Sequence, residues 1–103
     1  MSLPNNLGAY EDCVNLFERA LQAKKGIQVS YTSHGDAYQL FSRLHYTRKL
    51  LREKSMTMHT NDDPRYNTTT YDLLIVRRPR EVNGEWWVFI EQRVITGKIE
   101  ELV

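Results

Sequence analysis

The chain contains one cysteine, and it has no long run of apolar residues. A single thiol cannot close an internal disulfide, which excludes the disulfide-stapled scaffolds of small secreted proteins. No apolar stretch approaches the roughly 20 residues that span a bilayer, and no basic, apolar leader opens the sequence. We therefore expect an intracellular, cytoplasmic protein that does not bind a membrane.

An excess of charge of one sign is also lacking. The 14 lysines and arginines nearly balance 13 aspartates and glutamates, which leaves a net charge of +1. This balance excludes a protein whose whole surface binds a polyanion, but it leaves open a protein with one basic side.

Recognisable catalytic motifs are missing as well. The sequence has no GxxxxGK or GxGxxG phosphate loop, no CxxC pair and no evident pair of catalytic carboxylates. Its histidines are scattered, and His59 with Asp62 and Asp63 is more typical of a turn than of a metal site. Cys13 lies on an apolar helical face, where a buried, unreactive thiol is expected. We therefore expect no enzyme, no catalytic residues, no cofactor and no metal.

A length of 103 residues fits one domain, about two-thirds of whose surface is buried on folding. Residues 1–9 are polar and predict a loose lead-in. Apolar residues recur every three or four positions from Tyr10, which predicts a helix that Gly26 ends in the left-handed conformation. Alternation over residues 27–31 predicts a strand.

A second helix is predicted from about His34 to about Lys54. Ser33 is placed to cap its first turn, with Asp36 three residues further on, as in a capping box. Residues 55–68 then form the one long loop.

Two strands, over residues 69–78 and 86–95, close the domain before a short tail at residues 96–103. The Asn83–Gly84 pair between them favours a type I′ hairpin turn. The order α-β-α-β-β predicts a two-layer α+β domain. Its small sheet, antiparallel or mixed, has three strands and carries both helices on one face.

The second helix has an aromatic and basic flank. Residues 37–58 hold five basic and one acidic side chain, a local net charge of +4. This flank predicts a surface for the phosphates of a nucleic acid, and the alternative is a solvated face paired with Asp62, Asp63 and Asp72. On a helical wheel the flank contains Tyr38, His45, Lys49 and Arg52, while Arg43 and Lys54 lie on the opposite flank.

Arg48 falls inside the apolar stripe of this helix, where a guanidinium must reach water or find a partner. Asp72 is the expected partner, because it is an acidic residue within an otherwise apolar predicted strand. A buried structural pair and a contact to a ligand both remain open for Arg48.

The hairpin turn also predicts the register of its strands. It pairs Val82 with Glu85, Arg80 with Trp87 and Arg78 with Phe89. A bulge at Pro79 would move the first strand by one residue and exchange its faces. Without a bulge, the face toward the helices carries Leu73, Ile75, Trp86, Val88, Ile90 and Val94. The open face then carries Asp72, Leu74, Val76, Arg78, Arg80, Trp87, Phe89, Glu91, Arg93 and Ile95.

Trp87 and Phe89 stand beside arginines on this open face. They could stack on bases or bind a partner protein. The alternative is that they are cross-strand packing beneath arginine stems, or a contact in a homodimer.

Two segments carry a resemblance to a known group. They are GIQVSYTSHGDAYQLFSRLHYTRKLLREK (Gly26–Lys54) and YDLLIV (Tyr71–Val76). Together they resemble small uncharacterised proteins of tailed bacteriophages over about half of the chain. The resemblance implies an infected host cell as the context, and it implies no activity and no functional residue.

The leading prediction is a small non-enzymatic module that binds DNA or RNA. The alternative is a protein-interaction or homo-oligomerisation domain that uses the open sheet face. The candidate anion-binding residues are Arg43, His45, Arg48, Lys49, Arg52, Arg78 and Arg80, and the candidate stacking or interface residues are Tyr38, Trp87 and Phe89.

Overall fold

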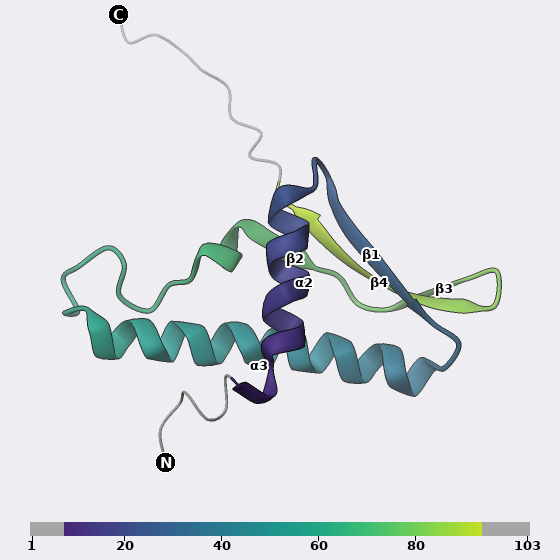
Figure 1. Ribbon diagram of the computed structural model, residues 1–103, viewed down its shortest axis with the longest axis horizontal. Coiled ribbons are helices and arrows are strands. Elements are labelled where there is room, and N and C mark those ends of the chain that lie inside the picture. The colour runs from purple at the N-terminus through teal and green to yellow at the C-terminus, as the bar shows by residue number, and fades with distance from the viewer. Residues whose placement is uncertain (1–7, 94–103) are drawn as a thin grey trace, which may run out of the picture.

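The computed structural model describes residues 8–93, and it confirms an α+β fold (Figure 1). The predicted lead-in lies largely outside these residues, as do the last two residues of the predicted final strand and the tail. The elements are α2 (Glu11–Gln22), β1 (Gly26–Tyr31), α3 (His34–Met58), η1 (Thr70–Leu73), β2 (Leu74–Val76), β3 (Arg80–Val82) and β4 (Glu85–Gln92).

Helix α2 buries Cys13, Phe17 and Ala20, as the spacing of its apolar residues predicts. The prediction that Gly26 ends this helix is wrong, because Ala23 is the C-cap and has an extended backbone. The free backbone carbonyls at the end of the helix are instead bound by the side-chain amide of Gln92. It donates to the carbonyls of Ala20, Leu21 and Ala23 at 2.9–3.1 Å.

Gly26 is required for a different reason, because it starts β1 pressed against β4. Its φ is +111°, and a Cβ at this position would lie 2.2 Å from the carbonyl oxygen of Ile90. The glycine therefore serves the close approach of two strands.

Helix α3 starts at the predicted cap, where the Ser33 hydroxyl accepts from the backbone N–H of Asp36 at 3.4 Å. It continues one turn beyond the predicted end at Lys54. The Ser55 hydroxyl donates to the Arg52 carbonyl and accepts from the N–H of Thr68 at 3.0 Å. This link fastens the following loop to the last turn and stabilises it.

The predicted strand 69–78 is replaced by η1 and β2, and β3 forms after it, next to the hairpin turn, which gives four strands instead of three. A reciprocal cap explains the start of η1. The N–H of Thr69 donates to the Asp72 carboxylate at 3.0 Å, and the Thr69 hydroxyl accepts from the N–H of Tyr71 at 3.4 Å. A Thr-x-x-Asp cap therefore prevails over the strand propensity of the apolar residues that follow.

The hairpin is confirmed near its turn and altered further away. Asn83 and Gly84 both have positive φ, and Val82 pairs with Glu85. Arg80 pairs with Trp87, but Val76 pairs with Ile90, so one extra residue lies between the two pairs. The segment 77–79 is therefore a bulge.

The bulge exchanges the faces of β2, so the prediction made without it is wrong for this strand. Leu74 and Val76 are buried under the helices, whereas Leu73 is 52% exposed. The predicted pairing of Arg78 with Phe89 is also replaced, because Arg77 donates its backbone N–H to the Phe89 carbonyl at 3.0 Å.

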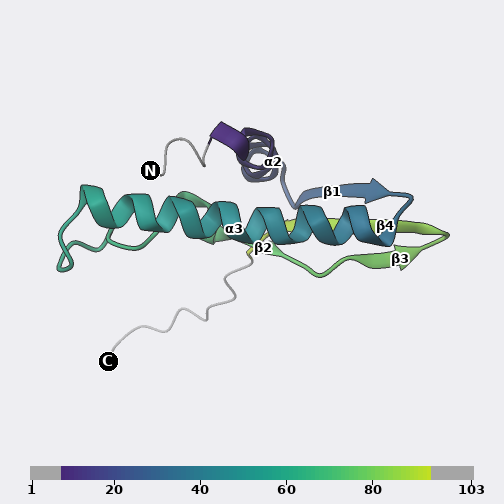
Figure 2. The same cartoon turned by 90° about the horizontal axis from the view of Figure 1, so that it is seen from below.

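The sheet is antiparallel in the order β1-β4-β2, and β3 pairs with the other end of β4. Both helices pack on one face, and α3 runs along the sheet and continues past it (Figure 1). Figure 2 shows β4 between β1 and β3. The core joins Phe17, Ala37, Leu40, Leu44, Tyr71, Leu74, Val88 and Ile90. The other face, which includes Trp87 and Phe89, lies opposite the helices.

Candidate interaction surface

The arginines of α3 that the sequence suggested for ligand binding are mostly engaged in the fold. Arg43 forms a bidentate ion pair with Asp12, with distances of 2.6 and 2.8 Å, and also donates to the Ala9 carbonyl at 3.0 Å. The hydrogen bond from Arg43 is the main reason that the pKa of Asp12 lies below its ordinary value. Arg43 therefore joins the two helices.

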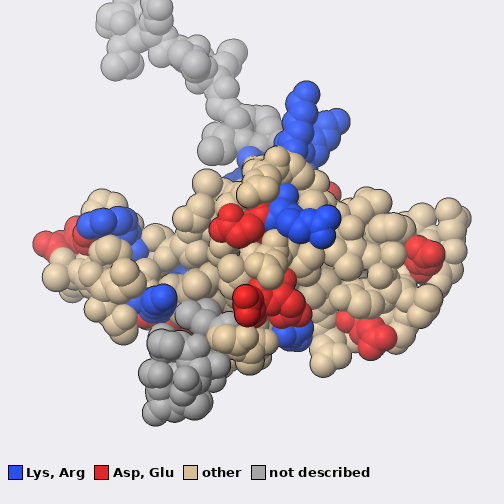
Figure 3. Space-filling model, viewed as in Figure 1, with Lys and Arg blue, Asp and Glu red and all other residues tan. Residues whose placement is uncertain are grey.

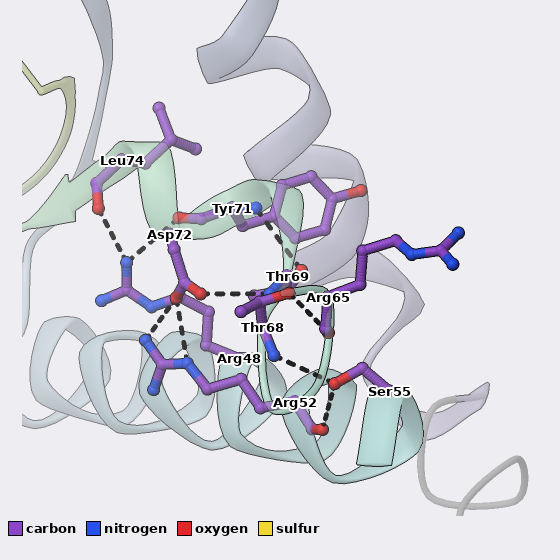
Figure 4. A network of polar contacts seen from close by, with 9 residues as sticks. All are labelled: Arg48, Arg52, Ser55, Arg65, Thr68, Thr69, Tyr71, Asp72 and Leu74. Atoms are coloured by element: carbon purple, nitrogen blue, oxygen red, sulfur yellow. Dashed lines mark hydrogen bonds and ion pairs between the residues drawn. The ribbon is translucent and has the colours of Figure 1, made fainter. Parts of the chain in front are cut away.

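Arg48 is only 8% exposed. One of its amino groups donates to the carbonyls of Leu74 at 2.7 Å and Tyr71 at 3.2 Å (Figure 4). Its Nε has no hydrogen-bond partner among the described residues. Burial, with a further contribution from nearby Arg52, lowers the pKa of the guanidinium. Arg48 is thus held by backbone carbonyls at the end of η1.

The prediction that Asp72 is the partner of Arg48 is wrong. Asp72 forms its ion pair with Arg52, one turn further along α3, and the Arg52 Nε lies 3.0 Å from the carboxylate (Figure 4). Burial by itself raises the pKa of Asp72, but hydrogen bonds from Arg52 and Thr69 bring it below its ordinary value. This network holds η1 and the preceding loop against α3.

The alternative, in which Asp62, Asp63 and Asp72 pair with the helix, is confirmed for Asp72 and wrong for the two loop aspartates. Asp63 pairs with Arg65 of the same loop at 2.8 Å, and Asp62 accepts from Thr60. Within residues 8–93, no cluster of histidine, cysteine and carboxylate side chains could hold a metal ion. His59 lies 3.8 Å from Asp63 and has no third ligand beside it.

The exposed part of the α3 flank is a row of aromatic rings. His34 lies 4.4 Å from both Tyr38 and Trp86, measured between ring centroids. Further along, Phe41 contacts His45 at 4.6 Å, and burial with nearby Arg48 and Arg52 lowers the pKa of His45. Tyr38 and His45 were predicted as site residues, but their aromatic neighbours were not. The 4-3-4 spacing of positions 34, 38, 41 and 45 could have shown this row.

The open sheet face brings together three of the predicted residues. The Arg80 guanidinium lies 4.9 Å from the centre of the Phe89 ring, a cation–π distance. Gln28 pairs with Phe89 across the strands and Ser30 with Trp87, so small or flexible polar side chains flank both rings. This face has a shallow depression of about 480 Å³ that is lined by Gln28, Arg80, Val82, Asn83, Glu85, Trp87 and Phe89.

The remaining predicted cations are dispersed. Lys49 and Arg78 are exposed and form no ion pair with another described residue. Arg77 pairs with Glu91 at 2.6 Å. Basic and acidic side chains alternate over the face of the molecule that Figure 3 shows, and no single basic patch covers that face. Two carboxylates from outside the helix form ion pairs with cations of α3, so the local net charge falls from +4 to +2.

The site and the fold define a small α+β domain with an aromatic, open antiparallel sheet. No protein-family model matches this chain, nor does any curated protein or solved structure. Among the described residues, no helix is both long enough and apolar enough to cross a membrane.

Proposed function

We propose that this protein is a non-enzymatic binding module that recognises a partner protein through Arg80, Trp87 and Phe89 on the open sheet face. The observation that carries this proposal is the pair of large, half-buried aromatic side chains on the sheet face opposite the helices. Tryptophan and arginine are enriched among the residues that dominate protein interfaces, where a flat aromatic surface can be desolvated at low entropic cost.

The charge of this face supports a protein partner over a polyanion. Arg77 is neutralised by Glu91, and Glu85 lines the same depression as Arg80. A face whose basic side chains are partly offset by two glutamates and that carries two aromatic anchors matches an interface core with a polar rim. A phosphate backbone would need several unpaired cations side by side.

Nucleic-acid binding is the second candidate, and one observation favours it. Arg78 and Arg80 form no ion pair within residues 8–93, and Arg80 lies over the Phe89 ring, on which a base could stack. This candidate predicts that retention on DNA or RNA falls steeply between about 50 and about 200 mM salt.

A photo-crosslinking amino acid at position 87 separates the two candidates. The matched control carries the same group at Tyr46, an α3 side chain that is 41% exposed. We expect the probe at position 87, and not the control, to crosslink to one defined protein in extracts of the source cells. That protein, once purified, should bind the Trp87→Ala variant at least about 10-fold more weakly, with little dependence on salt.

Two outcomes would count against a protein partner on this face. One is the same set of crosslinked proteins at positions 87 and 46. The other is crosslinking only to nucleic acid, together with the steep salt dependence described above, which would favour the second candidate.

A further inference from the structure

Strand β1 is an outer edge of the sheet, because it pairs only with β4. The Lys25 carbonyl accepts from the N–H of Gln92 at 3.2 Å, so these two residues form a hydrogen-bonded pair between the two strands. In an antiparallel pair, hydrogen-bonded and non-hydrogen-bonded positions alternate. The backbone N–H and C=O groups of Gln28 and Ser30 therefore point away from β4, and they form no hydrogen bond within residues 8–93.

The opposite edge of the sheet is protected against pairing with another strand. Its two strands, β2 and β3, have three residues each, and the bulge with Pro79 separates them. Arg77 and Arg78 in this bulge are exposed, as is Arg80 of β3. Short strands, proline, bulges and charged side chains are the devices by which proteins prevent edge-to-edge association.

Strand β1 has none of these devices. Its six residues, GIQVSY, include no charge and no proline, and they are paired without interruption along β4. Figure 2 shows β1 at the side of the sheet away from β3, with no further strand beyond it. An unprotected edge of this length is a ready template for another strand.

We infer that the edge of β1 is covered by β1 of a second copy of this chain, in an antiparallel pair about a two-fold axis. The charges at the ends of the strand favour this occupant. Lys24 and Lys25 precede β1, and Asp36 follows it and lines a shallow depression with Tyr31. All three side chains are exposed, and none forms an ion pair with another described residue.

Antiparallel pairing makes these charges complementary. It brings the start of one β1 to the end of the other, so the two lysines of each copy approach Asp36 of its partner. Identical patches must complement themselves at a two-fold interface, and this patch does so at both ends. The pair joins two four-stranded sheets into one, and both faces that carry Trp87 and Phe89 lie on the same side.

Sedimentation velocity over about 1 to about 300 µM protein tests the inference, because association depends on concentration by mass action. Gln28→Pro removes an outward N–H from β1, and Gln28→Ala is the matched control that keeps it. We expect the wild type and Gln28→Ala to dimerise and Gln28→Pro to remain monomeric, with at least about 10-fold weaker association. Circular dichroism establishes that each variant is folded.

A second set of variants leaves the strand unchanged. Asp36→Lys should weaken the dimer because it opposes Lys24 and Lys25 of the partner copy. Adding Lys24→Asp and Lys25→Asp to the same chain should restore it. Dimerisation that is unaffected by Asp36→Lys would overturn the inference, since the occupant would then lack the complementary charges.

Two further outcomes would also overturn it. One is a wild type that stays monomeric throughout the concentration range, even if it binds an extended peptide at β1. The other is a dimer broken by Trp87→Ala but not by Gln28→Pro, which places self-association on the open face. Since Trp87→Ala should leave the β1 dimer intact, failure of this inference is distinguishable from failure of the proposed partner site.

Discussion

Helix α3 and the open sheet face use the same residue types in opposite ways. Both combine arginines with aromatic rings, and they lie on opposite sides of the sheet. On α3, Arg43 and Arg52 form ion pairs with carboxylates, and Arg48 donates to two backbone carbonyls. On the sheet face, Arg80 lies over Phe89 and has no ion pair among the described residues.

This difference shows that the groups which the arginines bind within the fold, as much as their number, decide whether a basic segment can bind a ligand. An arginine that satisfies buried groups contributes to stability and is withheld from ligands. An exposed arginine over a half-buried ring contributes little to stability and remains available for contact. Substitutions of the α3 arginines should therefore alter unfolding, whereas substitutions on the sheet face should alter binding.

The largest effect that would test this contrast is expected from Arg48→Ala. It leaves a cavity and removes the hydrogen bonds to Leu74 and Tyr71, so we expect a loss of about 3 kcal/mol in the free energy of unfolding. Urea denaturation followed by circular dichroism measures this loss. Arg48→Met, which keeps the side-chain stem, should recover part of it.

Lys49→Ala is the matched control, because Lys49 is the exposed neighbour of Arg48 on the same helix. Its effect should lie within about 0.5 kcal/mol of the wild type. Equal losses in the free energy of unfolding for Arg48→Ala and Lys49→Ala would contradict the distinction between cations that hold the fold together and cations that are free to bind a ligand.

An intermediate effect is expected from Asp72→Asn. The change breaks the pair with Arg52 and weakens the cap at Thr69, so it should cost about 1 kcal/mol at neutral pH. The pKa of Asp72 is lowered by folding, so its contribution is present above the pKa of an unfolded carboxyl, about 3.9, and is lost as the pH falls through the folded pKa.

The stability difference between wild type and Asp72→Asn should therefore shrink as the pH falls from about 5 toward about 2. Urea midpoints measured across this range follow the difference. If it stayed constant or grew on acidification, the Asp72 carboxylate would not be the group that holds η1 to α3.

The smallest effect is expected on the sheet face. The contact between Arg80 and Phe89 is partly exposed, so a double-mutant cycle with Arg80→Ala and Phe89→Leu should give a coupling of about 0.5 kcal/mol. A coupling above about 2 kcal/mol would mean that this contact stabilises the fold as the arginine contacts of α3 do.

Features that depend on neighbouring residues could be predicted from the sequence. The apolar spacing of α2, the Ser33 cap and the Asn83–Gly84 turn are local, and the structure confirms each of them. The cap formed by Thr69 and Asp72 was equally local, since it has the same three-residue spacing as Ser33 and Asp36. The apolar run after it concealed this signal.

Other features depend on groups that meet only after folding. The carbonyls that hold Arg48 lie 23 and 26 residues further along the chain, and they belong to backbone, which leaves no trace in side-chain identity. The pair of Arg43 with Asp12 spans 31 residues. The placement of Arg80, Trp87 and Phe89 on one sheet face could be predicted because β4 and the hairpin turn are continuous in the sequence.

The bulge at residues 77–79 makes the domain sensitive to the length of one short segment. Side chains alternate between the two faces of a strand, so a chain shortened by one residue here would reverse β2 if its pairing followed the hairpin without interruption. Leu74 and Val76 would then face solvent, and Leu73 and Ile75 would face the helices. In this segment the number of residues matters more than their identity, so substitutions should be tolerated where a single deletion is not.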